Sequence, residues 1–157
     1  MRVTRAQYSA FSQTVAAIPI LDLGRARRDM PADRATRTTM IEISQRFSFD
    51  AAHHLDAGAA ENRRLHGHSF YVEVVLRGEP DAGTGFLRDF GQVDAALKAV
   101  RDLLDHRLLN EVEGLGNPTL ENIARFIHAR AKAALPEVAR VRVERPSYGQ
   151  SCTYEGA

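Results

Sequence analysis

The chain has 157 residues, enough for one ordinary domain and too few for two full ones. Hydrophobic residues make up 44 % and charged residues 26 %, which is the composition of a globular protein with a core. The net charge of +1 gives no reason to expect nucleic-acid binding, the single Cys152 excludes an intrachain disulfide, and no apolar run reaches the roughly 20 residues of a membrane span. We therefore expect a cytoplasmic protein that binds neither nucleic acid nor membranes.

Residues 1–39 differ in composition from the rest of the chain. They contain seven arginines and three aspartates, whereas residues 40–157 hold 14 basic and 17 acidic residues. Apolar residues do not recur here with the period of a strand (2) or of a helix (3.6). The apolar stretch at 15–21 contains Pro19 and is too short for the hydrophobic part of a signal sequence. We interpret 1–39 as a poorly ordered N-terminal extension, or as sequence translated upstream of a true start at Met40. The arginine content leaves a transit peptide as the alternative, and residues 40–157 form the predicted domain.

Two stretches after Met40 alternate between apolar and polar residues, which is typical of strands with one buried face. The first spans 41–51 and the second spans 66–76. Their same-face residues are Ile41, Ile43, Phe47, Phe49 and Ala51 in the first stretch, and His66, His68, Phe70, Val72, Val74 and Leu76 in the second. The residues between them, 54–65, have no period and are predicted to form a loop.

The period changes after a predicted turn at 81–85, beyond which residues 86–90 are expected to extend the sheet briefly. Apolar residues spaced by three or four predict an amphipathic helix over about 91–110 and a second helix that begins after Pro118-Thr119 and ends at Pro136. Strands follow at 141–143 and 151–154. The order ββααββ predicts an α+β fold in which two helices cover one face of an antiparallel sheet. The uncovered face then predicts association with further copies of the chain.

Four of the six histidines lie at the ends of the two long predicted strands. His66 and His68 point to the same face, about 7 Å apart along the strand. If the strands are antiparallel, His53 comes close to His66 on the apolar face, whereas His54 points the opposite way. Three neutral imidazoles can bind zinc and leave a fourth position open, as in catalytic zinc sites. A His-x-His pair alone is more often ordinary polar surface, so the zinc interpretation depends on the third histidine.

Several short motifs accompany these histidines. They are Phe49-x-Ala51-Ala52-His53, Leu65-His66-Gly67-His68-Ser69-Phe70, Leu104-Asp105-His106 with Leu109-Asn110, Asn117-Pro118-Thr119-x-Glu121-Asn122, and Val143-Glu144. Together they resemble the 6-pyruvoyl-tetrahydropterin synthase / 6-carboxy-tetrahydropterin synthase family. The resemblance covers about residue 41 to the end of the chain and does not reach 1–39. The tunnelling fold of this family has the same ββααββ order.

The resemblance implies a zinc-dependent lyase in which His53, His66 and His68 bind the metal. The implied substrate is 7,8-dihydroneopterin triphosphate and the implied product is 6-carboxy-5,6,7,8-tetrahydropterin, for queuosine or other deazapurine synthesis. Zinc would lower the pKa of the side-chain hydroxyls of the substrate. Members of the family generally form homohexamers with active sites between subunits, which would bury the uncovered sheet face.

The resemblance also implies roles for residues outside the zinc site. Asp105 and His106 would form a proton relay, Glu144 would anchor the pterin ring, and Thr119 and Glu121 would contribute to the substrate pocket. Each position has an ordinary alternative. His106 and Glu121 suit the end and the start of a predicted helix, Asp105 could be solvated surface, and Glu144 could pair with a neighbouring arginine. We assign no role to His128.

One position departs from the family. Its usual members have a cysteine in the loop before the Leu-His-Gly-His motif, where it acts as the proton-abstracting base. The matching position here is Asn62, which cannot act as a base. The adjacent Glu61 can, and family variants with a glutamate in this role cleave dihydroneopterin derivatives for folate synthesis. Cys152 is predicted to be a buried structural thiol near the C-terminus.

Three functions therefore stay open. The first is the 6-carboxy-tetrahydropterin synthase reaction, and the second is the glutamate-type cleavage for folate synthesis. The third is a non-catalytic, oligomeric protein that binds pterin or metal, since the usual base is missing.

Overall fold

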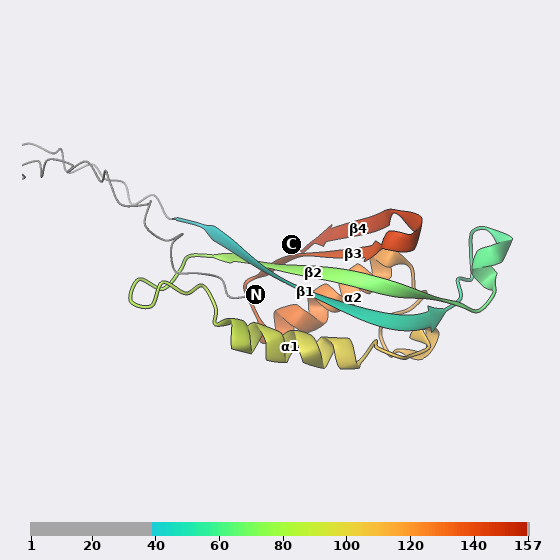
Figure 1. The fold of residues 1–157 in the computed structure, drawn as a ribbon, viewed down its shortest axis with the longest axis horizontal. Coiled ribbons are helices and arrows are strands. Elements are labelled where there is room, and N and C mark those ends of the chain that lie inside the picture. Colours follow the sequence, from blue (N-terminus) through green and yellow to red (C-terminus); the bar gives the residue numbers. More distant parts are fainter. Residues whose placement is uncertain (1–38, 157) are drawn as a thin grey trace, which may run out of the picture. The chain divides into compact units, whose positions relative to one another are not determined.

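The computed structural model describes residues 39–156, and the predicted extension 1–39 lies outside this range except for Thr39. Four strands form one antiparallel sheet in the order β1-β2-β3-β4, and two helices cover one of its faces (Figure 1). The elements are β1 (Ile41–His53), β2 (His66–Gly78), α1 (Phe90–Asp102), α2 (Leu120–Ala134), β3 (Val138–Arg145) and β4 (Gln150–Glu155). This arrangement confirms the predicted α+β fold. In the described part of the chain, no helix is long and apolar enough to span a membrane.

The core lies between the sheet and the helices. Odd-numbered residues of β1 and even-numbered residues of β2 point toward the helices, as the alternating pattern predicts. Phe49 and Phe70 stand opposite each other in the ladder, and their rings stack with centroids 4.9 Å apart. Leu97 of α1 and Ile127 of α2 are also almost completely buried. The opposite face of the sheet has no helix over it and carries mostly polar side chains.

The predicted helix over 91–110 is too long. α1 ends at Asp102, and the chain then turns back toward the free edge of β1. The backbone N–H of His106 donates to the carbonyl of Asp50, and the N–H of Ala52 donates to the carbonyl of Arg107. The apolar spacing continued past the helix because Leu104 still packs into the core after the helical hydrogen bonds have ended. Hydrogen bonding to the open strand edge therefore overrode the local pattern.

The expected brief strand at 86–90 is also wrong. Residues 86–89 form no strand, and Phe90 begins α1. The side chain of Asp89 accepts a hydrogen bond from the backbone N–H of Gln92, which makes Asp89 the N-cap of the helix. The capping aspartate was the local signal for a helix start at this point.

Candidate metal centre and substrate pocket

Three histidine side chains converge at one end of the sheet. β1 and β2 pair so that His53 stands opposite His66, and His68 follows on the same face two residues later. The candidate ligand nitrogens of the three rings all lie within 4.8 Å of one another. Gly67 lies between the two β2 histidines, and a Cβ atom there would be only 3.2 Å from the carbonyl oxygen of Ala51. The glycine thus permits the close approach of β1 and β2 at this point.

Hydrogen bonds from the protein orient two of these imidazoles. Nδ1 of His53 lies 2.9 Å from the carbonyl oxygen of Pro118, and Nδ1 of His66 lies 2.7 Å from that of Arg64. A carbonyl only accepts, so each Nδ1 carries the proton and each Nε2 keeps its lone pair. Nε2 of His53 is buried and has no hydrogen-bond partner in the described structure. A buried acceptor of this kind, with its other nitrogen fixed by a carbonyl, fits the usual environment of a metal-binding histidine.

The environment also favours the neutral form of His53 and His68. Burial lowers the pKa of His53, and the neighbouring positive charges lower it further. Burial and the adjacent Arg145 guanidinium together lower the pKa of His68 to about 4. Neutral imidazole is the form that binds a cation, so these residues fit the zinc ion that the sequence predicts.

A cavity of about 390 Å³ reaches the histidine cluster at His53. Its lining includes His53, Thr119, Glu121 and Arg145. The Thr119 hydroxyl caps α2 by accepting from the N–H of Asn122, which fixes the loop at the cavity wall. Hydrogen bonds from its own backbone N–H and from Thr119 lower the pKa of Glu121, so its carboxylate is ionised at neutral pH. The structure therefore brings Thr119 and Glu121 together with the histidine cluster.

Asp105 and His106 lie at a different place, along the free edge of β1. An Asp105 oxygen accepts from the N–H of Asp50, 3.0 Å away, and lies 3.1 Å from Nδ1 of His106. The Asp50 hydrogen bond lowers the pKa of Asp105. His106 has a left-handed backbone, with φ of 58°, and its side chain is largely exposed. The sequence placed both residues in the last turns of a helix, and the structure places them beyond its end.

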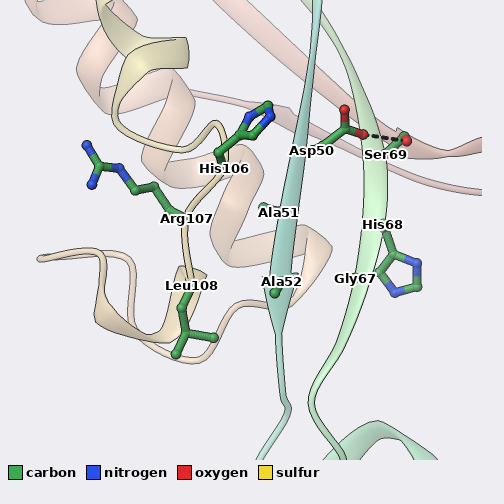
Figure 2. A pocket seen from close by; sticks show the side chains of 9 residues that line it. All are labelled: Asp50, Ala51, Ala52, Gly67, His68, Ser69, His106, Arg107 and Leu108. Atoms are coloured by element: carbon green, nitrogen blue, oxygen red, sulfur yellow. Dashed lines mark hydrogen bonds between the residues drawn. The ribbon is translucent and has the colours of Figure 1, made fainter.

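An open cavity of about 630 Å³ extends from His106 across the end of β1 to Ser69 and His68 (Figure 2). In Figure 2 the His106 ring lies on one side of the two strands and the His68 ring lies on the other. His106 and His68 line the same cavity, but within one chain no hydrogen bond, ion pair or ring contact among the described residues joins Asp105 or His106 to the three histidines.

Glu144 lies on the uncovered face of the sheet. It stands opposite Tyr71 in the β2–β3 ladder, on the reverse side from the core residue Val143. Its carboxylate accepts a hydrogen bond from Nε of Arg142 at 2.5 Å. The structure thus separates Glu144 from the three histidines of its own chain.

The loop between β1 and β2 contains the short 3₁₀ helix Ala60–Arg63. The carbonyl of Asn62 accepts from the N–H of Leu55 at 2.8 Å and so closes the loop. Glu61 is exposed on this 3₁₀ helix, and none of the contacts found among the described residues joins it to the three histidines.

Arg145 is a site residue that the sequence analysis missed. Its Nη1 lies 3.1 Å from Nε2 of His68, and it lines the cavity beside the cluster. The alternation of Val141, Val143 and Arg145 indicated that the arginine faces the helices, but its proximity to His68 required the pairing of β2 with β3.

Neither Cys152 nor His128 has a described contact with the three histidines. Cys152 is partly buried opposite Val143, and burial raises the pKa of its thiol. His128 is buried on α2 against Tyr154, with ring centroids 5.1 Å apart.

Comparison with known proteins supports the fold and shows the family. The family model described as 6-pyruvoyl tetrahydropterin synthase matches residues 42–157. A dihydroneopterin monophosphate aldolase of Pyrococcus furiosus is 43 % identical over 94 residues, which are 60 % of this chain and 77 % of that protein. A 6-carboxy-5,6,7,8-tetrahydropterin synthase of Synechocystis is 39 % identical over 107 residues, 64 % of this chain and 83 % of that protein.

The solved structure of Caenorhabditis elegans 6-pyruvoyl tetrahydropterin synthase superposes with a TM-score of 0.67 and 27 % sequence identity. The match covers 77 % of this chain and 99 % of that one. The chain therefore belongs to the 6-pyruvoyl tetrahydropterin synthase family, a family of lyase-type pterin synthases.

Proposed function

We propose that this protein is a zinc-dependent lyase that acts on the side chain of 7,8-dihydroneopterin triphosphate and yields 6-carboxy-5,6,7,8-tetrahydropterin, a step toward deazapurines such as queuosine. The observation that supports this most directly is the cluster of His53, His66 and His68 beside a cavity of about 390 Å³. Relatives named as 6-carboxy-5,6,7,8-tetrahydropterin synthases support the same reaction, including a Haemophilus influenzae protein that is 33 % identical.

The proposed mechanism assigns a task to each group in the pocket. His53, His66 and His68 would hold zinc, and zinc bound there would supply Lewis-acid polarisation of the side-chain hydroxyls of the substrate. The ionised carboxylate of Glu121 accepts hydrogen bonds from donor groups of the bound pterin, and Thr119 holds the pocket wall. The carbonyls of Pro118 and Arg64 keep the imidazoles of His53 and His66 in the orientation that binds a cation.

We assign the relay and the ring anchor to neighbouring subunits. Asp105, His106 and Glu144 lie away from the cluster of their own chain, on the strand edge and the uncovered face. In a homohexamer with sites between subunits, the relay and the anchor of one copy would serve the histidine cluster of another. Proton transfer by a positioned Asp–His pair is ordinary general acid–base catalysis.

Product identification tests the proposal. Purified protein with measured zinc content is incubated with 7,8-dihydroneopterin triphosphate, and we expect release of acetaldehyde and triphosphate together with the carboxylated pterin. No turnover by fully zinc-loaded protein would contradict a catalytic function. Zinc and pterin binding without any product would instead support the non-catalytic binding protein.

A second candidate is the glutamate-type cleavage that yields 6-hydroxymethyl-7,8-dihydropterin for folate synthesis. Two observations favour it: the loop has Asn62 where a cysteine base is usual, and Glu61 is adjacent to it. The Pyrococcus relative is named as an aldolase of dihydroneopterin monophosphate, and a solved Plasmodium vivax 6-pyruvoyltetrahydropterin synthase has a glutamate named as its catalytic residue. The hydroxymethyl and carboxyl products differ in mass, so the same incubation separates the two reactions.

Glu61→Gln tests the base in either reaction. We expect the turnover rate to fall by about 10²- to 10⁴-fold, because a positioned general base contributes that much. Zinc content should not change, since Glu61 has no described contact with the histidines. Glu113→Gln, an exposed glutamate in another loop, is the matched control and should keep the wild-type rate. A Glu61→Gln protein that turns over at full speed would exclude Glu61 as the base.

A further inference from the structure

Arg145 is the last residue of β3; it contacts His68 and lines the same cavity as His53. Its Nη1 donates to Nε2 of His68 at 3.1 Å, and its Nη2 donates to the side-chain oxygen of Gln150. The guanidinium carbon lies 5.4 Å from the ring centroid of Tyr148. This stacking restricts the guanidinium and limits the entropy that it would lose on binding a ligand.

Among residues 39–156, no carboxylate oxygen lies within 4.0 Å of the Arg145 guanidinium; the carboxylate that feels its charge is Glu121, across the same cavity. Six other basic side chains of this part of the chain form ion pairs with carboxylates at 4.0 Å or less: Arg46, Arg88, Lys98, Arg101, Arg140 and Arg142. The hydrogen-bond partners of Arg145 are instead an imidazole nitrogen of His68 and the side-chain oxygen of Gln150. Its Nε is buried and has no hydrogen-bond partner in the described structure. A partly buried guanidinium that lines a cavity, forms no ion pair and keeps an unpartnered N–H has the donors that bind an anion.

We propose that Arg145 binds the side-chain phosphate of the substrate and makes the enzyme specific for phosphorylated dihydroneopterins over the free alcohol. This inference rests on the proposed function. In a phosphorylated dihydroneopterin, the reacting hydroxyls and the first phosphate sit on one three-carbon side chain. A cationic group in contact with His68 is therefore within reach of that phosphate when the hydroxyls lie at the histidine cluster.

The chemistry of His68 adds a second reason. Nε2 of His68 has a single lone pair, which now accepts the hydrogen bond from Arg145. If that lone pair ligates a metal ion, Nη1 loses its partner and becomes available to an oxyanion. The guanidinium then presents N–H donors in the fork geometry that matches phosphate.

The test compares Arg145→Gln and Arg145→Lys with the wild type. For each protein, kcat/KM is measured with 7,8-dihydroneopterin triphosphate, the monophosphate and unphosphorylated 7,8-dihydroneopterin. We expect Arg145→Gln to lower the preference for the phosphorylated substrates by about 10- to 100-fold, as expected for the loss of charge-assisted hydrogen bonds. Arg145→Lys should restore part of this preference because it restores the charge.

A binding measurement separates this inference from the proposed function. Calorimetry with inorganic triphosphate on the zinc-loaded protein should show affinity that falls about 10-fold or more in Arg145→Gln. Arg140→Gln, at the other end of β3 and paired with Glu42, is the control and should bind like the wild type. If triphosphate binding depends on Arg145 but no pterin is turned over, the proposed function is wrong and Arg145 is still an anion-binding residue.

Two outcomes would overturn the role of Arg145. One is an active Arg145→Gln protein whose preference for phosphorylated substrates and whose affinity for triphosphate both equal those of the wild type. The other is loss of zinc from Arg145→Gln by metal analysis, with equal losses of rate for phosphorylated and unphosphorylated pterins, because that pattern would make Arg145 a structural partner of His68.

Discussion

His66→Ala should abolish stoichiometric zinc binding and lower turnover by more than about 100-fold, since loss of even an outer-shell partner of a metal ligand typically costs about 10- to 100-fold. The fold should persist. The ring of His66 is only partly buried, and its hydrogen bond goes to the carbonyl of Arg64, which lies in an exposed loop. Metal analysis of the purified variant and far-ultraviolet circular dichroism measure the two effects independently of any substrate.

His54→Ala is the control for this substitution. His54 follows His53 directly, but its side chain is substantially exposed and lies near Asp56. We expect zinc content and turnover to match the wild type. A His66→Ala protein that retains one equivalent of zinc would refute the three-histidine site. Loss of zinc from His54→Ala would show that His54, rather than His53, is the zinc ligand on the first strand.

Leu97→Ala should have the largest effect on stability. Leu97 lies on α1, is 1 % exposed and belongs to the core between helix and sheet. Truncation removes buried methyl groups and leaves a cavity, and such changes cost about 2–5 kcal/mol of unfolding free energy. A domain of this size has a total stability of about 5–15 kcal/mol, so the variant loses a large share of it. Denaturant unfolding followed by circular dichroism gives the difference.

Leu103→Ala provides a matched comparison. Leu103 lies at the C-terminal end of the same helix but is 44 % exposed, so its truncation leaves no closed cavity. We expect a change within about 0.5 kcal/mol. Equal destabilisation by both substitutions would contradict the packing of α1 that the structure describes.

The alternation in the sequence predicted the sheet and the convergence of His53, His66 and His68, because both follow from which residues share a face. A strand with one buried face has a period of 2, so the apolar residues of β1 and β2 determine which side chains share a face. Because His53 shares the face of the apolar residues of β1 and His54 does not, the sequence favoured His53 as the ligand. The β1–β2 register then places His53 opposite His66. The resemblance to the family likewise indicated, without any structure, that Asn62 stands where its usual members have a cysteine.

Only the tertiary structure determined where α1 ends and which side chains on neighbouring strands contact each other. The apolar spacing predicted helix to residue 110, but the free hydrogen-bonding edge of β1 draws residues 106–108 out of the helix and moves Asp105 and His106 to that edge. The proximity of Arg145 to His68 depends on the pairing of β2 with β3, which joins residues 77 positions apart. Periodicity reports which way a side chain points, whereas its neighbours across the sheet depend on long-range pairing that no local pattern contains.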